Sequence, residues 1–141
     1  MQSSHNTRNP SPIKGNSVTL VGPVYWGSVA LAVLLHESAH LAAAYLGGVR
    51  VKHVGLSWKG PYIVRDPGTP VQNTVISLSG PGINLLLCLL CLHLSGTFAF
   101  VNGFLAVMNL LPIRSSDGLR VYRIWKQLDK HDLKELSSSQ S

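Results

Sequence analysis

The sequence has few charged residues, and this shortage decides its class. Only 13% of its 141 residues are Asp, Glu, Lys or Arg, against about 25% in an ordinary soluble domain. None of the four occurs from Pro67 to Ile113, and Glu37 is the only one from Ser17 to Val49. Such long uncharged stretches argue against a compact soluble enzyme, and their hydrophobicity argues against disorder. The pattern predicts an integral membrane protein.

Cysteine is scarce as well. The two cysteines, Cys88 and Cys91, both lie in the apolar run LLLCLLCLHL. A CxxC pair can bind zinc or carry out redox chemistry, but inside an apolar helix we expect two small, soft core residues. Because a disulfide between residues three apart on one helix is strained, the pair indicates no redox compartment.

Positive charge is in excess, with twelve Lys and Arg against six Asp and Glu and a formal net charge of +6. A basic surface is typical of nucleic-acid binding. Here, however, the basic residues flank the apolar blocks, and no run mixes them with aromatic residues on which bases stack. The charges therefore predict contact with a lipid bilayer and no nucleic-acid partner.

Three apolar blocks predict about three transmembrane helices, and hence an all-α membrane protein. They cover approximately Pro23–Leu46, residues 71–94 and residues 97–111. A bilayer core of about 30 Å needs about 20 helical residues, so the first two are long enough and the third is short. Ser95 and Gly96 separate the second block from the third, which predicts a tight helical hairpin.

The segment between the first two blocks has a different pattern. Val54, Leu56 and Trp58 alternate with small or polar residues, which predicts a strand. A turn at 59–61 and the apolar residues 62–64 predict a return strand. We therefore expect a small membrane-associated β-hairpin, which serves either to hold an extended substrate or as a structural element at the membrane rim.

The C-terminal segment from Arg120 to Leu136 has the pattern of an interfacial amphipathic helix. Val121, Trp125 and Leu128 share one face, and basic residues lie elsewhere around the helix. The predicted organisation is a flexible N-terminal tail over residues 1–16, a membrane core over 17–118, and an amphipathic helix with a C-terminal tail over 119–141.

The distribution of basic residues predicts the orientation in the membrane. Three spans place the two termini on opposite sides. The loop between the first two spans holds four basic residues and the C-terminal segment six, against two in the N-terminal tail. By the positive-inside rule the loop and the C-terminus are cytoplasmic and the N-terminus lies outside. We therefore expect a multi-pass protein of the cell membrane.

The only charged residue of the first span lies in the motif HESAH. His36 and His40 are four residues apart and share one helix face, a spacing that lets two imidazoles hold one Zn²⁺. Glu37 is adjacent and suits the general base that activates water. Because an ionisable residue inside a span is costly, a functional role is the first interpretation.

A catalytic zinc site has three protein ligands, so one more is needed. Asp117, which follows the third apolar block, is the acidic candidate. At 1.5 Å per residue His40 lies about 10 Å from the cytoplasmic end of its helix, and Asp117 follows the cytoplasmic end of the third block. His53 and His93 are rival candidates, but we expect both to be interfacial or structural residues.

Three motifs together resemble the signatures of the site-2 protease family, intramembrane zinc metalloproteases. HESAH lies in the first span, SGPGIN in the second and NLLPIRSSDG after the third, matching HExxH, GPxxN and N-x-x-P-x-x-x-x-D-G in order. The resemblance covers about residues 20–125. It implies His36, His40 and Asp117 as ligands of one Zn²⁺ per chain, Glu37 as catalytic base or acid, and transmembrane proteins as substrates.

The resemblance also implies that Asn84 positions substrate or steadies the oxyanion. The alternative role for Asn84 is a hydrogen bond between helices, and Gly80 and Gly82 are expected to permit close helix packing. The alternative function is a non-proteolytic zinc-binding membrane protein that acts as a binding or sensing module. The intact Glu37 argues against that alternative.

Overall fold

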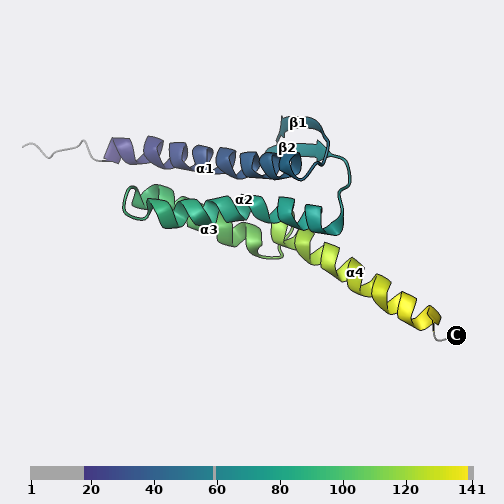
Figure 1. Ribbon diagram of the computed structural model, residues 1–141. Helices are drawn as coiled ribbons and strands as arrows, with labels where there is room; N and C mark the ends of the chain where they lie inside the picture. The colour runs from purple at the N-terminus through teal and green to yellow at the C-terminus, as the bar shows by residue number, and fades with distance from the viewer. Residues whose placement is uncertain (1–17, 59, 140–141) are drawn as a thin grey trace, which may run out of the picture.

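The structure is a computed structural model that describes residues 18–58 and 60–139. Over these residues the elements are α1 (Val18–Leu46), β1 (Val51–Ser57), β2 (Gly60–Arg65), α2 (Pro70–Cys91), α3 (Gly96–Leu110) and α4 (Asp117–Ser139). In Figure 1, α1, α2 and α3 run side by side, the hairpin lies at the C-terminal end of α1, and α4 extends away from the other helices. The predicted flexible tail, residues 1–16, lies outside the described residues.

Two of the described helices are long and apolar enough to cross a membrane. They are α2 and the Gly22–Leu46 part of α1, whereas α3 is apolar but has only 15 residues, or about 22 Å. The predicted mostly helical fold with a small β-hairpin is thus confirmed. Of the three predicted spans, two reach the required length.

The helix ends follow from local sequence. Thr69 forms a capping box for α2, because its Oγ1 accepts from Gln72 N while Gln72 Oε1 accepts from Thr69 N. At the end of α1, Gly48 adopts a φ of 69°, as expected for a glycine stop. The prediction that α1 begins at Pro23 is wrong, since the helix extends back to Val18. A proline near a helix start is tolerated in an apolar helix.

The hairpin is a two-stranded antiparallel sheet that pairs Val54 with Ile63 and Ser57 with Gly60, with an irregularity between Val51 and His53. Both strands lie in the segment between the first two apolar blocks for which the hairpin was predicted. The hairpin lies beside the C-terminal end of α1, as Figure 1 shows.

The helices bury small and polar side chains and expose large apolar ones. Where α2 meets α3, a Cβ added at Gly103 would lie 2.9 Å from Cys88 Sγ, so the two helices approach closely at this point. The exposed fractions of Leu34, Leu90 and Phe100 are 63%, 63% and 69%. The buried polar residues are His36, His40, Ser77, Asn84, Asn102, Ser116 and Asp117. Large apolar side chains are thus exposed along the helices, although Ile76 and Val101 are buried between them.

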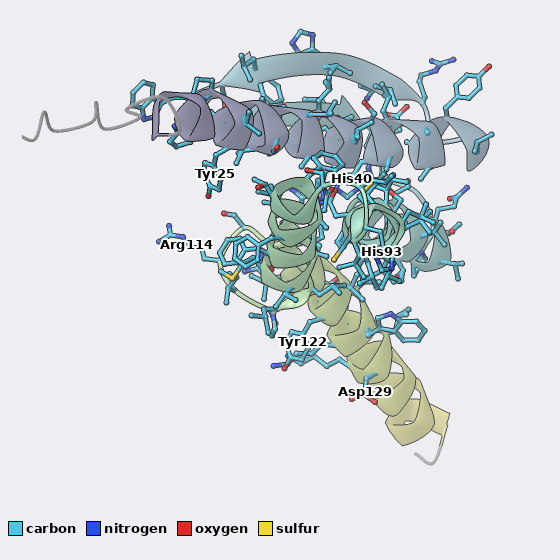
Figure 2. All side chains as sticks on the ribbon, turned by 90° about the vertical axis from the view of Figure 1, so that its left-hand side faces the viewer. Tyr25, His40, His93, Arg114, Tyr122 and Asp129 are labelled. Atoms are coloured by element: carbon cyan, nitrogen blue, oxygen red, sulfur yellow. The ribbon has the colours of Figure 1, made fainter. Side chains whose placement is uncertain are left out.

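Helix α4 begins at Asp117, so the predicted boundary after residue 118 falls within its first turn. Of the predicted apolar face, Val121 and Leu128 are half-buried, whereas Trp125 is exposed. Figure 2 shows Tyr122 and Asp129 along the part of α4 that leaves the other helices. Only the start of this helix therefore contributes to the site described next.

Candidate metal centre

Two imidazoles from α1 form one side of a buried cluster. His36 and His40 lie one turn apart on the same helix face, and each is only 6% exposed. Their rings are nearly perpendicular, with centroids 4.7 Å apart. Figure 2 shows His40 between α1 and the helices below it. Both side chains thus point away from the outer surface and into the space between the helices.

The first residue of α4 completes the cluster. Asp117 Oδ2 lies 3.2 Å from His36 Nε2 and 3.1 Å from His40 Nε2, and the two nitrogens are 3.1 Å apart. Atoms that share one zinc ion at bond lengths of about 2.0–2.1 Å and tetrahedral angles are about 3.3 Å apart. The three residues predicted as zinc ligands therefore come together with the spacing that a metal site requires.

The hydrogen bonds behind the imidazoles orient their Nε2 atoms. His40 Nδ1 donates to the carbonyl oxygen of Ile76 at 2.6 Å. A carbonyl oxygen only accepts, so the proton of a neutral His40 is on Nδ1 and the lone pair of Nε2 faces the cluster. Such a carbonyl partner is typical of metal-binding histidines.

Asn84 contacts the Nδ1 side of His36, as the Ile76 carbonyl does for His40. It is fully buried, and its amide lies 3.1 Å from His36 Nδ1. In the structure Asn84 Nδ2 faces His36 Nδ1, and Asn84 Oδ1 has no partner among the described residues. A flip of the amide, which exchanges its oxygen and nitrogen, lets His36 Nδ1–H donate to Oδ1 and gives that buried oxygen a partner. Nε2 of His36 then also presents a lone pair. Two lone pairs and a carboxylate that converge at about 3 Å repel one another unless a cation lies between them.

Charge around Asp117 keeps it ionised. Burial raises the pKa of its carboxyl group, but the hydrogen bonds with the His36 and His40 side chains and the nearby positive charge, including that of Arg120, lower that pKa well below its usual range. The Nη1 of Arg120 donates to Asp117 Oδ1 at 3.2 Å. The cluster therefore offers two imidazole nitrogens and one anionic oxygen.

The turn between α3 and α4 places Asp117. Ser116 Oγ donates to the carbonyl oxygen of Leu111 at 2.6 Å and accepts from Leu119 N at 3.1 Å, so this residue caps α4. A Cβ added at Gly118 would lie 2.6 Å from the carbonyl carbon of Leu110. The start of α4 is thus packed directly on the backbone at the end of α3.

This packing makes Gly118→Ala a test of how Asp117 is positioned. The methyl group would meet backbone atoms, so α4 must shift and Asp117 with it. We expect thermal unfolding in detergent to show a loss of about 1–3 kcal/mol and zinc affinity to fall. Gly96→Ala is the matched control, because Gly96 also lies in the first turn of a helix and has open space around it. Equal zinc affinity in the two variants would contradict the proposed positioning.

Gly80 of α2 makes room for both imidazoles. A Cβ added there would lie 2.6 Å from His40 Cε1 and 2.7 Å from His36 Cε1. At Gly82 nothing lies within 4 Å, so the prediction that Gly82 permits close helix packing is wrong. The spacing contains a signal for this difference, because Ile76, Gly80 and Asn84 recur every four residues and so face α1 together.

The cluster lines a cleft of about 530 Å³. Glu37, the predicted base, is half-buried in the same wall, and no side chain of the described residues forms an ion pair with it. The opposite side includes Tyr62 and Arg65 of β2 together with Arg120. The hairpin therefore borders the cleft, and the two arginines are lining residues for which the sequence contained no recognised motif.

The rival histidines lie outside the cluster. His53 is exposed on β1, where its ring centroid is 5.8 Å from that of Tyr62. His93 is exposed beyond the end of α2. The expectation that neither joins His36 and His40 agrees with their positions. Asn84, in contrast, is not among the lining residues of the cleft, and its contact with His36 favours the hydrogen bond between helices.

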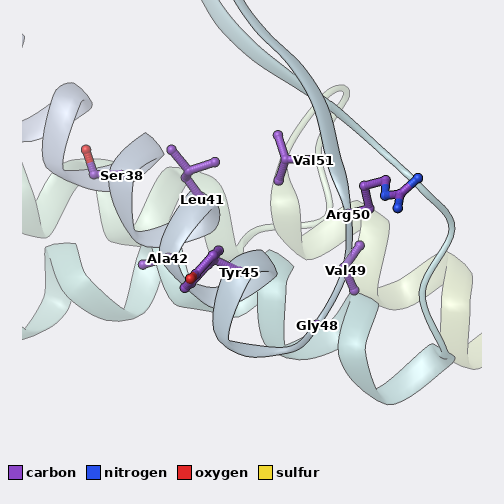
Figure 3. Close-up of a pocket in the computed structure, with 8 residues that line it drawn as sticks. All are labelled: Ser38, Leu41, Ala42, Tyr45, Gly48, Val49, Arg50 and Val51. Carbon is purple, nitrogen blue, oxygen red and sulfur yellow. The ribbon is translucent and has the colours of Figure 1, made fainter.

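A second, more open hollow of about 760 Å³ lies on a different face of α1. Figure 3 shows Leu41 and Tyr45 on the helix and Val49, Arg50 and Val51 opposite them. Arg50 is its only charged lining residue. The candidate metal ligands therefore lie in the smaller of these two cavities, the cleft that contains the His–His–Asp cluster.

Comparisons of the chain with protein-family models, with curated proteins and with solved structures found no match. The functional assignment therefore depends on the three sequence motifs and on the buried His36–His40–Asp117 cluster, which could hold a metal ion.

Proposed function

We propose that the protein is an intramembrane zinc metalloendopeptidase of the site-2 protease type that hydrolyses peptide bonds of transmembrane protein substrates. The observation that carries the proposal is the buried cluster of His36, His40 and Asp117, whose three acceptor atoms lie 3.1–3.2 Å apart. Glu37 lines the same cleft. A set of metal ligands with an adjacent carboxylate that can act as general base is the arrangement found in zinc hydrolases.

Zinc is the proposed metal because of the donor set. Two imidazole nitrogens and one carboxylate oxygen suit Zn²⁺, and three protein ligands leave a fourth position open, as in catalytic zinc sites. The partners of the imidazoles support this choice. The Ile76 carbonyl and the Asn84 amide direct the Nε2 atoms of His40 and His36 toward one point. We propose one Zn²⁺ per chain.

The membrane setting is proposed from the large apolar side chains that the helices expose. Large apolar side chains cover the outside of α1 and α2, and the polar residues are buried between the helices. We propose that α1, α2 and the shorter α3 all cross the bilayer, with local thinning of the bilayer at α3. The N-terminus then lies outside the cell, and the hairpin and α4 lie on the cytoplasmic side.

In the proposed mechanism Glu37 moves the protons. Zinc, when bound, polarises the scissile carbonyl and makes water a better nucleophile at neutral pH. Glu37 takes a proton from the attacking water and delivers it to the leaving amide nitrogen. The edge of β2, which borders the cleft, holds the substrate in an extended form by backbone hydrogen bonds. Asn84 acts by orienting His36.

Removal of the metal tests this proposal. The purified protein in vesicles is given a single-span reporter, and metal analysis is expected to find one zinc per chain. Chelation should abolish cleavage, and added zinc should restore it, because the water is not activated without the ion. Cleavage that continues in metal-free protein would refute the mechanism. One bound zinc without cleavage of any reporter would favour the non-proteolytic binding or sensing module.

A further inference from the structure

A second cavity adjoins the cleft and is rich in arginine. Its volume is about 640 Å³, and it shares Ile63, Arg65 and Arg120 with the cleft. Arg123 of α4 and Asn73 of α2 also line it. We call this cavity, bounded by Arg65, Arg120 and Arg123, the arginine pocket. It opens between the end of β2, the first half of α2 and the start of α4.

The positive charge of the arginine pocket is poorly balanced. Arg65 is half-buried, and its Nη1 donates to Oδ1 of Asn73, a neutral group, at 2.6 Å. The carboxylate of Asp66 also lines the pocket, but it pairs with Lys52. Among the side chains that the structure describes (residues 22–58 and 60–130), no carboxylate pairs with Arg65 or Arg123. The pocket therefore has room and charge for an added anion.

Electrostatics support the same conclusion. Burial lowers the pKa of Arg65, and the positive charge of Arg120 lowers it further. Arg120 is already paired with Asp117, so Arg65 is the arginine of this pair without a carboxylate partner among the described side chains, and an anion bound beside it would offset the repulsion between the two guanidinium groups. A carboxylate is well matched to this site, because a guanidinium group can bind it through two parallel hydrogen bonds.

We propose that the arginine pocket binds an acidic side chain of the substrate, an Asp or Glu in the cytoplasmic segment next to the cleaved bond. This inference rests on the proposed protease function and specifies its substrate. The protein would thus select single-span proteins with an acidic residue near the cytoplasmic membrane surface.

The position of the pocket favours a peptide over a lipid head group. Ile63 and Arg65 lie two residues apart on β2, so a peptide that pairs with this strand passes from the cleft to the pocket within a few residues. Arg120 joins the two sites, since it contacts both the pocket and Asp117 Oδ1. A group bound there is therefore close to the peptide bond at the metal.

The test compares reporters that carry Glu or Gln at successive cytoplasmic positions. The wild-type protein should cleave the reporter with Glu at the preferred position with a kcat/KM about 10- to 100-fold higher than its Gln counterpart. In Arg65→Gln the difference should disappear. Arg50→Gln, which removes an exposed arginine that lines the other hollow, is the matched control and should retain it. A Lys reporter should be cleaved better by Arg65→Glu than by the wild type.

A binding arm makes the test independent of proteolysis. Labelled cytoplasmic peptides with Glu or Gln are titrated onto the Glu37→Gln protein in a neutral detergent, and the acidic peptide should bind about 10-fold tighter. Equal cleavage of the Glu and Gln reporters at every position, or equal affinity for the Glu and Gln peptides, would overturn the inference. An effect of Arg65→Gln seen only in vesicles with anionic lipid, and equal for both reporters, would assign the pocket to lipid. If the wild type cleaves nothing, the protease proposal fails while the peptide titration still decides the inference.

Discussion

Glu37→Gln is expected to stop proteolysis while the protein keeps its zinc. Glutamine has nearly the same size but cannot take a proton from water, and loss of a general base costs about 10²–10⁴-fold in rate. The proposed ligands are His36, His40 and Asp117, so the metal content should remain one ion per chain. Cleavage of a single-span reporter and metal analysis on the same preparation measure the two effects.

The matched control is Ser38→Ala at the adjacent position. Ser38 is exposed on another face of α1, and its hydroxyl donates to the carbonyl oxygen of Leu34. This variant should cleave the reporter at the wild-type rate. Cleavage by Glu37→Gln at that same rate would refute the role of Glu37. Loss of zinc together with activity would instead show that Glu37 maintains the site, which would also contradict the proposed role.

The cluster of His36, His40 and Asp117 could be predicted in part because charge is so rare in this chain. The four-residue spacing of His36 and His40 fixes their common face on any helix. Asp117 follows the third apolar block, at the same predicted membrane side as the end of the first block. The histidine pair therefore follows from local spacing, whereas Asp117 was predicted from its place after the third block and from the resemblance to the site-2 protease motifs.

The contacts that α2 makes with the two imidazoles could not be predicted in the same way. Which backbone carbonyl accepts from His40 depends on the rotation and depth of α2 against α1, and no local pattern encodes these. The same is true of Gly80 and of the Asn84 contact with His36. The predicted start of α1 at Pro23 is wrong because proline is common in the first turn of a helix, whereas this helix begins five residues before the proline, at Val18.

The arginine pocket could not be predicted from the sequence either. Arg65 and Arg120 are 55 positions apart, and each flanks an apolar block as the positive-inside rule requires. Topology alone explains their presence, so nothing in the pattern marks them as a binding pair. Only the packing of α4 against the first half of α2 brings them to one cavity.

Gly80→Ala is expected to destroy the metal site although residue 80 supplies no ligand. The added methyl group would lie 2.6–2.7 Å from the Cε1 atoms of His40 and His36, so both rings must move by several tenths of an ångström or more. A catalytic constellation tolerates errors of only about 0.5 Å. We expect zinc affinity to fall by about 100-fold, with reporter cleavage lost at limiting zinc.

Gly82→Ala separates this effect from a general change in α2. It adds the same methyl group to the same helix two residues away, where nothing lies within 4 Å. Both substitutions raise helix propensity by about 1 kcal/mol, so a difference between them reports on the imidazoles alone. Zinc titration in detergent should find wild-type affinity for Gly82→Ala. Equal affinities in the two variants would mean that α2 does not press on the cluster, and the close packing of Gly80 against His36 and His40 would be wrong.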